Sequence, residues 1–518
     1  MLTRYLRGLP SYLGERLDPG AAPAWIAQAV QQRSTEFLRL LDEGVFRNPR
    51  SPYRDLFSWA SLEPEDVRRF VRAEGVEGAL RRLFEAGVYV TLEEFKGKSS
   101  IERGGRERGV GPADFDNPLT SRHFEGWSGG SGGAPRRSVY DLDFLSEDAV
   151  ARALFSDAFE LEDRTMALWR PAPPDNSALA NLLLDAKLGR PFDAWFVQKR
   201  HGFGPSGLQQ AAFTAATLWA ARRGGVPIPR PRYTPIRDAP RVASWLAGQK
   251  AAGRRPYLDS LVSCAVRVCL AAEERGLDVE GTFFRVGSEP FTAARAETIA
   301  RVGGHAAPYY AMMEAGLIGV GCATPEAVDD VHLLTHKLAA VTVSEGEPAP
   351  AIYLTTLRRT APKVMINVES GDVGQIAERA CGCSIGASGL STHAQDVRSH
   401  RKFTSEGMNF LAADLQELVD TVLPKRFGGA PTDYQFAERE VGGLPRVEVV
   451  VSPRVGHVEE TEVRETVLRH LACLDQGGRL MAGLWDQGET VTVVRREPHA
   501  TGVGKILALH VAEARESI

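Results

Sequence analysis

The chain has 518 residues, more than a single hydrophobic core usually supports, so we expect two or more domains. Hydrophobic residues make up 43% and charged residues 25%, which is typical of globular proteins and excludes disordered and membrane chains. With 62 Lys and Arg against 66 Asp and Glu, the net charge of -4 gives no general basic field for nucleic acid or acidic membranes.

Residues 1–17 carry several charges and no continuous apolar run, so they do not read as a signal peptide. No stretch reaches the roughly 18 unbroken apolar residues of a membrane span. Six cysteines are too few for a disulfide scaffold in a chain of this length, which favours a reducing compartment. We therefore expect a cytoplasmic protein.

The first hundred residues are predicted to be a helical lead-in, because apolar residues recur at helical spacing in 22–42, 64–72 and 78–86. From about 103 to 137 the chain is rich in Gly, Arg, Asp and Ser and is predicted to be a loop. Between 141 and 397, helical segments alternate with β-rich runs, which indicates layered α/β structure. The helices are expected at 208–222, 257–275 and 293–302, and the strands at 282–286, 351–356 and 363–368.

After Gly407 the pattern predicts a helix over 411–422, a strand over 447–451, a helix over 463–474 and a strand over 491–493. These residues fit a small α+β domain. The predicted fold is therefore α/β, with a large multi-layered N-terminal domain over 1–397 and a small mobile α+β domain over 398–518.

A run of glycine and serine lies within 126–137. Glycine lets backbone N–H groups approach an anion closely, and serine hydroxyls add donors, so the run is suited to wrapping a polyphosphate. A flexible linker is the alternative, since the Walker ending is absent. The candidate phosphate-binding residues are Ser128, Gly129, Gly130, Ser131, Gly132 and Gly133.

Together with segments later in the chain, this run resembles the ordered motifs of the adenylate-forming superfamily, in its phenylacetate-CoA ligase-like branch, and the resemblance covers nearly the whole chain. Residues 128–136 resemble that family's phosphate loop, with Ala134 where a lysine is usual. The strand-to-helix turn Gly287-Ser288-Glu289-Pro290 resembles the element that flanks adenine. The resemblance implies that ATP binds between these segments.

Further segments extend the resemblance. Residues 309–316 resemble the motif in which an aromatic ring, here Tyr310, packs on adenine and an acid, here Glu314, holds magnesium, although Ala311 and Met313 replace its usual Gly and Thr. Asp372, after an apolar strand, would accept hydrogen bonds from both ribose hydroxyls. Arg398 matches the ribose-contacting arginine of the hinge between the domains. At the two following positions where the family's hinge has acids, this chain has His400 and Arg401.

Residues 498–506 resemble the C-terminal loop that presents a catalytic lysine, which is Lys505 here. Attack of a carboxylate on the α-phosphate of ATP builds negative charge, and a lysine placed there stabilises it. On its own, a Gly-Lys pair is an ordinary surface turn.

A second set of residues predicts a metal site. Cys322, His332, Cys381 and Cys383 offer soft ligands that suit structural zinc, and a similar set occurs in zinc-bearing members of the same branch. Buried free thiols are the alternative, and His336 is an alternative fourth ligand. The remaining cysteines, Cys264, Cys269 and Cys473, lie on apolar helical segments and are expected in the core.

The resemblance implies ATP-dependent activation of a carboxylic acid to its acyl-AMP, with Mg²⁺ as cofactor, followed by acyl transfer to coenzyme A. An amine, a protein cysteine or a carrier-protein thiol fits the same first step, and a nucleotide-binding relative without turnover is a third hypothesis. The sequence does not identify the carboxylic acid. Residues 192–218, with Trp195 and Phe196, form either an acyl pocket on an aromatic-rich helix or part of the core. We expect no nucleic-acid or membrane partner, and a homodimer stays open.

Overall fold

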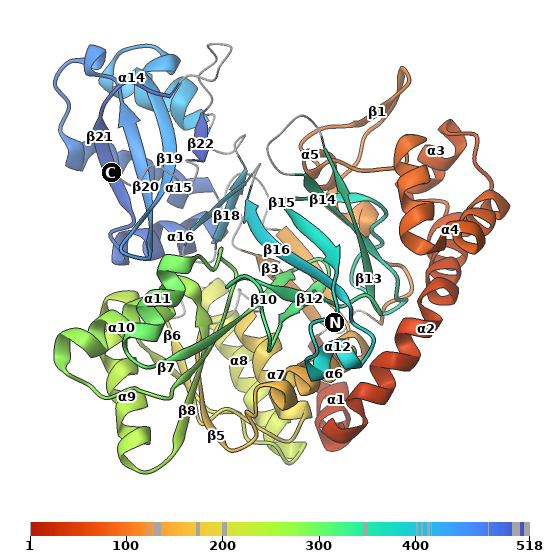
Figure 1. The fold of residues 1–518 in the computed structure, drawn as a ribbon. Helices are drawn as coiled ribbons and strands as arrows, with labels where there is room; N and C mark the ends of the chain where they lie inside the picture. Colours follow the sequence, from red (N-terminus) through yellow and green to blue (C-terminus); the bar gives the residue numbers. More distant parts are fainter. Residues whose placement is uncertain are drawn as a thin grey trace.

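A large mixed sheet organises most of the chain (Figure 1). The structure is a computed structural model and describes residues 2–121, 124–128, 136–171, 177–198, 205–344, 350–399, 402–405, 408–411, 415, 417–474, 476–499 and 508–511. Within these residues the large sheet has twelve strands in the order β13-β14-β15-β16-β12-β11-β10-β9-β8-β5-β6-β7. Helices cover it, as the alternation of apolar segments predicts.

Half of this sheet is parallel. Its strands run alongside one another from β7 to β10, in the order given above. They are β5 (Arg164–Trp169), β6 (Ala194–Val197), β7 (Pro231–Tyr233), β8 (Arg255–Leu261), β9 (Phe283–Gly287) and β10 (His305–Met312).

The other half is antiparallel and begins where β10 pairs with β11. Its strands are β11 (Gly316–Gly321), β12 (Val331–Leu333), β13 (Leu338–Val343), β14 (Ala351–Thr356), β15 (Val368–Glu378) and β16 (Thr392–Ser399). The strand β10 therefore belongs to both halves, and it carries Tyr310.

Apolar residues alternate between the two faces of the parallel half. Leu168 and Trp195 lie in the core under α1 (Leu2–Gly14), α6 (Leu142–Ala158), α7 (Ser177–Lys187) and α8 (Pro205–Arg223). Trp169 and Phe196 lie in the core on the other face, under α9 (Ala239–Ala251), α10 (Val262–Arg275) and α11 (Ala293–Arg301). Burial on both faces explains why these strands are almost continuously apolar.

The N-terminal helices pack against the antiparallel half, as the helical lead-in predicts. They are α2 (Ala22–Leu40), α3 (Pro52–Trp59), α4 (Pro64–Glu85) and the short α5 (Leu92–Phe95). The two helices expected at 64–72 and 78–86 lie within α4, where Gly75 has a φ of 73° and kinks the helix. Only glycine adopts that conformation readily.

Four sequence expectations for secondary structure before residue 400 are wrong. The helix expected over 257–275 starts at Val262, because its first residues belong to β8. The stretch 192–218 is no single helix, since it contains β6 before α8 begins. In 363–368 only Val368 belongs to a strand, β15. The expected loop 103–137 contains β2 (Arg106–Arg108) and β3 (Phe124–Ser128), which is followed by β4 (Arg136–Tyr140).

The C-terminal residues form a four-stranded sheet with helices, at the upper left in Figure 1. Its order is β21-β20-β19-β22, and a core of its own lies beneath it. The elements are β19 (Tyr434–Val441), β20 (Leu444–Val451), α15 (Glu460–Leu474), α16 (Gln476–Gln487), β21 (Val491–Arg495) and β22 (Leu509–Val511). Cys473, expected in the core, is exposed on α15.

Between the large sheet and this domain lie β17 (Lys402–Ser405) and β18 (Met408–Leu411), then a π-helical turn over Leu418–Val422 and α14 (Leu423–Phe427), where one helix was expected over 411–422. Arg398 lies on β16, within the large sheet. A domain boundary between 397 and 398 stays a prediction.

The C-terminal sheet contacts α10 and α11. Arg295 on α11 pairs with Glu440 at 3.0 Å and donates from Nε to the carbonyl oxygen of Gly443 at 3.1 Å. Arg267 on α10 donates to the carbonyl oxygen of Gly488 at 3.2 Å. Separately, among the described helices, none combines the length and apolarity needed to cross a membrane.

Candidate functional site

Two of the predicted nucleotide-binding residues meet directly. Tyr310 on β10 donates its phenolic proton to Oδ2 of Asp372 on β15, with 2.7 Å between the oxygen atoms. A register shift in the β10–β11 pair falls between Tyr310 and Ala311, the kind of irregularity that redirects side chains near ligand sites. Burial, reinforced by the Asp372 carboxylate, raises the pKa of Tyr310 well above its usual value.

Arg398 lies on the strand next to Asp372. Its neighbour in register on β15 is Val373, the residue after Asp372. The guanidinium group donates to Oδ2 of Asp329 at 2.7 Å, and Asp329 also accepts from the backbone N–H of Val397. The ribose-contacting residues expected from sequence are thus adjacent, and Asp329 is an additional carboxylate that fixes the arginine.

The turn that follows β9 lies beside the same strand, β10. A Cβ atom at Gly287 would lie 2.5 Å from the Tyr309 ring, so only glycine fits there. Ser288 has a φ of 67°, a conformation that costs energy for a residue other than glycine and that often marks functional sites. Glu289 accepts from the N–H and the hydroxyl of Ser263 at 2.7 and 3.0 Å, which caps the first turn of α10.

Beneath this turn is a buried ionic cluster that sequence reasoning missed. Asp259 on β8 is fully buried and accepts from Arg170 at 2.8 Å and from Arg285 at 2.6 Å. The Arg285 guanidinium carbon lies 3.8 Å from the Tyr309 ring centroid. Asp259, Arg285 and Tyr309 lie on separate strands and Arg170 directly follows β5, so only the sheet order brings them together.

Glu314, the expected magnesium ligand, forms an ion pair with a lysine side chain. It lies in the turn after β10, and its Oε1 forms an ion pair with Nζ of Lys96, the residue that follows α5. Magnesium prefers several oxygen ligands in near-octahedral geometry. Among the described residues no group of three or more acids gathers at Glu314. As arranged here, this carboxylate does not fit a resident magnesium ion.

The glycine-rich run 129–133 and Lys505 lie outside the described residues, as do the side chain of Ser128 and the hinge residues His400 and Arg401. The strands on either side of the glycine run are described: β3 and β4 pair antiparallel, with Ser128 opposite Arg136. The segment that contains Lys505 follows His499, whose backbone exchanges two hydrogen bonds with the Gln435 side chain, at 2.7 and 3.0 Å.

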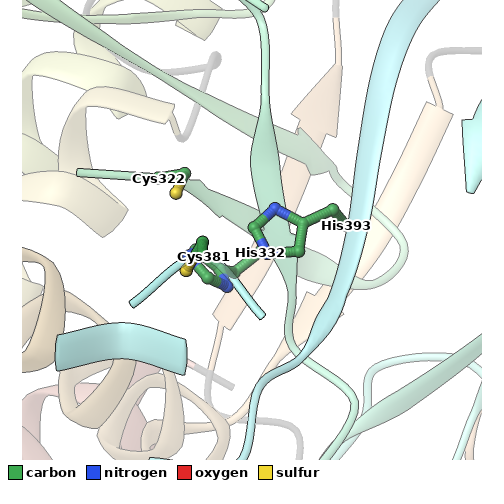
Figure 2. Close-up of side chains that lie close together, drawn as sticks. All are labelled: Cys322, His332, Cys381 and His393. Atoms are coloured by element: carbon green, nitrogen blue, oxygen red, sulfur yellow. The ribbon is translucent and has the colours of Figure 1, made fainter. Parts of the chain in front are cut away.

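The predicted metal ligands come together between β12, β16 and the segment after β15 (Figure 2). Nε2 of His332 is 3.1 Å from Sγ of Cys383 and 3.6 Å from Sγ of Cys381, and the two sulfur atoms are 3.3 Å apart. Ligand atoms of Cys322, His332 and Cys381 lie within 4.8 Å of one another. The structure thus brings the four residues close together, while their binding of a metal stays a prediction.

This cluster fits zinc. Nδ1–H of His332 donates to the carbonyl oxygen of Leu390 at 2.7 Å, which leaves the Nε2 lone pair facing the thiols. Burial lowers the pKa of His332 to about 4, so the imidazole is neutral, the form that binds metal. Thiolate and imidazole donors at these separations match a tetrahedral ion whose edges are roughly 3.5 Å.

His393 is a further donor that sequence reasoning missed. It lies opposite His332 in the β12–β16 register, and its ligand atom belongs to the same 4.8 Å group (Figure 2). Its Nδ1 is 2.7 Å from Oδ1 of Asp330. His336, the alternative ligand, lies elsewhere: it is buried edge-on against Trp25. Only pairing between strands reveals His393, because nothing in its local sequence marks it.

The chain was compared with known proteins. No protein-family model matches the sequence, and the search of curated proteins finds no match. Among solved structures, the chain is similar to 2-hydroxyisobutyryl-CoA ligase in complex with 2-HIB-AMP and CoA in the thioesterification state, with 13% identity and a TM-score of 0.54, over 96% of this chain and 91% of that chain.

Two more solved structures are similar to the chain. The same ligase in the postadenylation state with R3-HIB-AMP has 14% identity and a TM-score of 0.45, over 97% and 92% of the two chains. A long-chain-fatty-acid-CoA ligase from Archaeoglobus fulgidus has 12% identity and a TM-score of 0.33, over 73% and 65%. The similarity to the first ligase shows that the chain shares the fold of that protein, which confirms the expected α/β fold class.

Proposed function

We propose that this chain activates a carboxylic acid with ATP, forming an acyl-AMP and pyrophosphate, and then transfers the acyl group to a second acceptor. The observation that carries this proposal is the contact between Tyr310 and Asp372, with Arg398 on the adjacent strand. An aromatic ring in contact with a carboxylate suits a nucleoside, since the carboxylate can accept hydrogen bonds from ribose hydroxyls.

In the first step a carboxylate oxygen of the acid attacks the α-phosphorus of ATP. The bond from that phosphorus to the bridging oxygen of the β-phosphate breaks, and pyrophosphate leaves. We assign the polyphosphate to backbone and hydroxyl groups of residues 128–133, and the charge that develops on the α-phosphate to Lys505. Magnesium arrives as part of the substrate, MgATP.

In the second step a nucleophile attacks the acyl carbon and AMP leaves. The acceptor we propose is the thiol of coenzyme A, which the solved 2-hydroxyisobutyryl-CoA ligase complex also contains. A carrier-protein thiol or an amine completes the same chemistry. We further propose that residues 1–397 bind ATP and the acid, and that residues 398–518 deliver Lys505.

We propose that Cys322, His332, Cys381 and Cys383 hold a structural zinc ion, with His393 as an alternative donor. A complete set of nitrogen and sulfur ligands leaves no open position for a substrate, so the ion would tie β12 and β16 to the segment after β15. It takes no part in either step.

The test is ATP/pyrophosphate exchange against a panel of carboxylic acids. We expect exchange with at least one acid and its loss in Lys505→Ala, while Lys425→Ala, which removes an exposed lysine of α14, retains it. Measurable ATP binding without exchange for any acid would favour a nucleotide-binding protein without turnover. Adding coenzyme A or amines, with product masses measured, then identifies the acceptor.

A further inference from the structure

The ion pair between Lys96 and Glu314 joins parts of the chain 218 positions apart. The lysine side chain is 10% exposed and the glutamate side chain 11%, so both charges are largely removed from water. Water and dissolved salt weaken the attraction in a buried pair much less than in a surface ion pair. The ammonium group is therefore a persistent local cation beside Glu314.

The surroundings of Lys96 hold it in place. The helix that precedes it, α5, begins with a capping box in which Thr91 accepts from Glu94 N–H at 3.3 Å and donates its own N–H to the Glu94 carboxylate at 2.8 Å. The N–H of Leu92 donates to the buried carboxylate of Glu369 on β15 at 3.0 Å. Lys96 is thus anchored to the strand that carries Asp372, only three residues after Glu369.

Glu314 is positioned by the other side of the same site. It lies four residues after Tyr310, in the tight turn from β10 to β11. A divalent cation that approaches this carboxylate meets an ammonium group already in contact with it. Magnesium gives up its water shell reluctantly. Binding to a single carboxylate would not offset that cost and the loss of the ion pair with lysine.

We infer that Lys96 takes the cation position at Glu314 in the nucleotide-free protein and keeps a divalent metal from this carboxylate. The ammonium group already supplies the positive charge that the carboxylate would otherwise take from a metal ion. This inference does not rest on the proposed function.

The experiment measures Mn²⁺ binding to the full-length, nucleotide-free protein by electron paramagnetic resonance. Lys96→Met removes the competing charge, so we expect Mn²⁺ to bind roughly tenfold more tightly than in the unmodified chain. Lys96→Arg keeps the charge and is expected to bind as the unmodified chain does. Lys98→Met removes the charge of an exposed lysine two residues away and serves as the matched control.

The double variant Lys96→Met with Glu314→Gln identifies the binding atom, because it should lose the affinity that the single variant gained. Unchanged or weaker Mn²⁺ binding in Lys96→Met, with an unchanged melting temperature, would overturn the inference. Lys96→Gln provides a second neutral side chain if the methionine variant does not fold. These measurements contain no acid or ATP, so their outcome is separate from that of the exchange assay.

Discussion

Tyr310 and Asp372 lie 62 positions apart in the chain, yet a hydrogen bond of 2.7 Å connects their side chains. One residue ends the parallel half of the large sheet and the other lies in the antiparallel half. Arg398 is the neighbour in register of the residue after Asp372. The side chains of Tyr310 and Asp372 thus form one small polar surface, beside the strand that carries Arg398.

This surface predicts how nucleotide affinity responds to substitution. Asp372→Asn removes the charge of the carboxylate that we propose accepts from both ribose hydroxyls, so AMP and ATP should bind about tenfold to a hundredfold more weakly. Isothermal titration calorimetry measures the effect. Asp278→Asn changes an exposed residue that is not among the candidate site residues, so it should leave the affinity for AMP and ATP unchanged. Equal affinities for the unmodified chain and Asp372→Asn would remove Asp372 from the nucleotide site.

The cysteine and histidine cluster predicts bound zinc. The purified protein should contain about one zinc ion per chain, and Cys381→Ser together with Cys383→Ser should abolish it and lower the melting temperature. Elemental analysis and thermal unfolding test both expectations. Cys473→Ser, which changes an exposed thiol, should affect neither. Zinc that survives the double substitution would show that these two thiols do not bind it.

The buried cluster around Asp259 predicts a large loss of stability. Burial alone would raise the pKa of Asp259, but the guanidinium groups of Arg285, Arg170 and Arg152 outweigh it and hold the pKa well below its usual range. Asp259→Asn would remove the negative charge that pairs with Arg170 and Arg285, while Arg152 keeps Asp185. We expect the free energy of unfolding to fall by about 3–5 kcal/mol, measured with urea.

A matched control separates this effect from the loss of any ion pair. Asp278 forms an ion pair with Lys250 at the surface, where its side chain is 70% exposed. Asp278→Asn should change the free energy of unfolding far less than Asp259→Asn does. A similar small cost for Asp259→Asn would mean that the buried arginines are compensated in another way.

Stability should depend on pH through Glu438, on β19 near the contact between the sheets. Burial, with the carboxylates of Glu289 and Glu440, raises its pKa from 4.5 to about 8, and Arg295 opposes the shift. The folded protein then holds a proton that the unfolded chain has lost between these two values. The free energy of unfolding should therefore fall as the pH rises from 4.5 towards 8.

Calorimetry of the full chain at about pH 6 and about pH 8.5 checks this expectation. Glu438→Gln cannot lose a proton, so its melting temperature should change less over the same interval. A pH dependence that is the same with and without Glu438 would assign it to other groups, such as the histidines.

Sequence reasoning located the elements whose apolar period is clear. The strand Ala351–Thr356 and the helix Ala293–Arg301 lie where they were expected, within one residue. It failed over 257–275, where β8 is buried on both faces. A strand of that kind has no alternation, so its period cannot be distinguished from the start of the helix after it.

For the site, short motifs point to residues that lie close together in sequence, such as Gly287 to Glu289, whose role stays a prediction. Lys96 could not be found in this way, because its contact with Glu314 depends on how α5 lies against β15. His393 was missed for a related reason, since its position opposite His332 follows from strand order alone. Partners set by tertiary structure leave no local pattern.

Because β10 pairs in parallel with β9 and antiparallel with β11, it is the one described strand shared by the two halves of the large sheet. One hydrophobic cluster serves the parallel half, a second serves the antiparallel half, and a third spans both. A nucleotide that contacts Tyr310 on one side and Asp372 on the other would add a further connection between the halves. Ligand binding should then stabilise both halves against unfolding together.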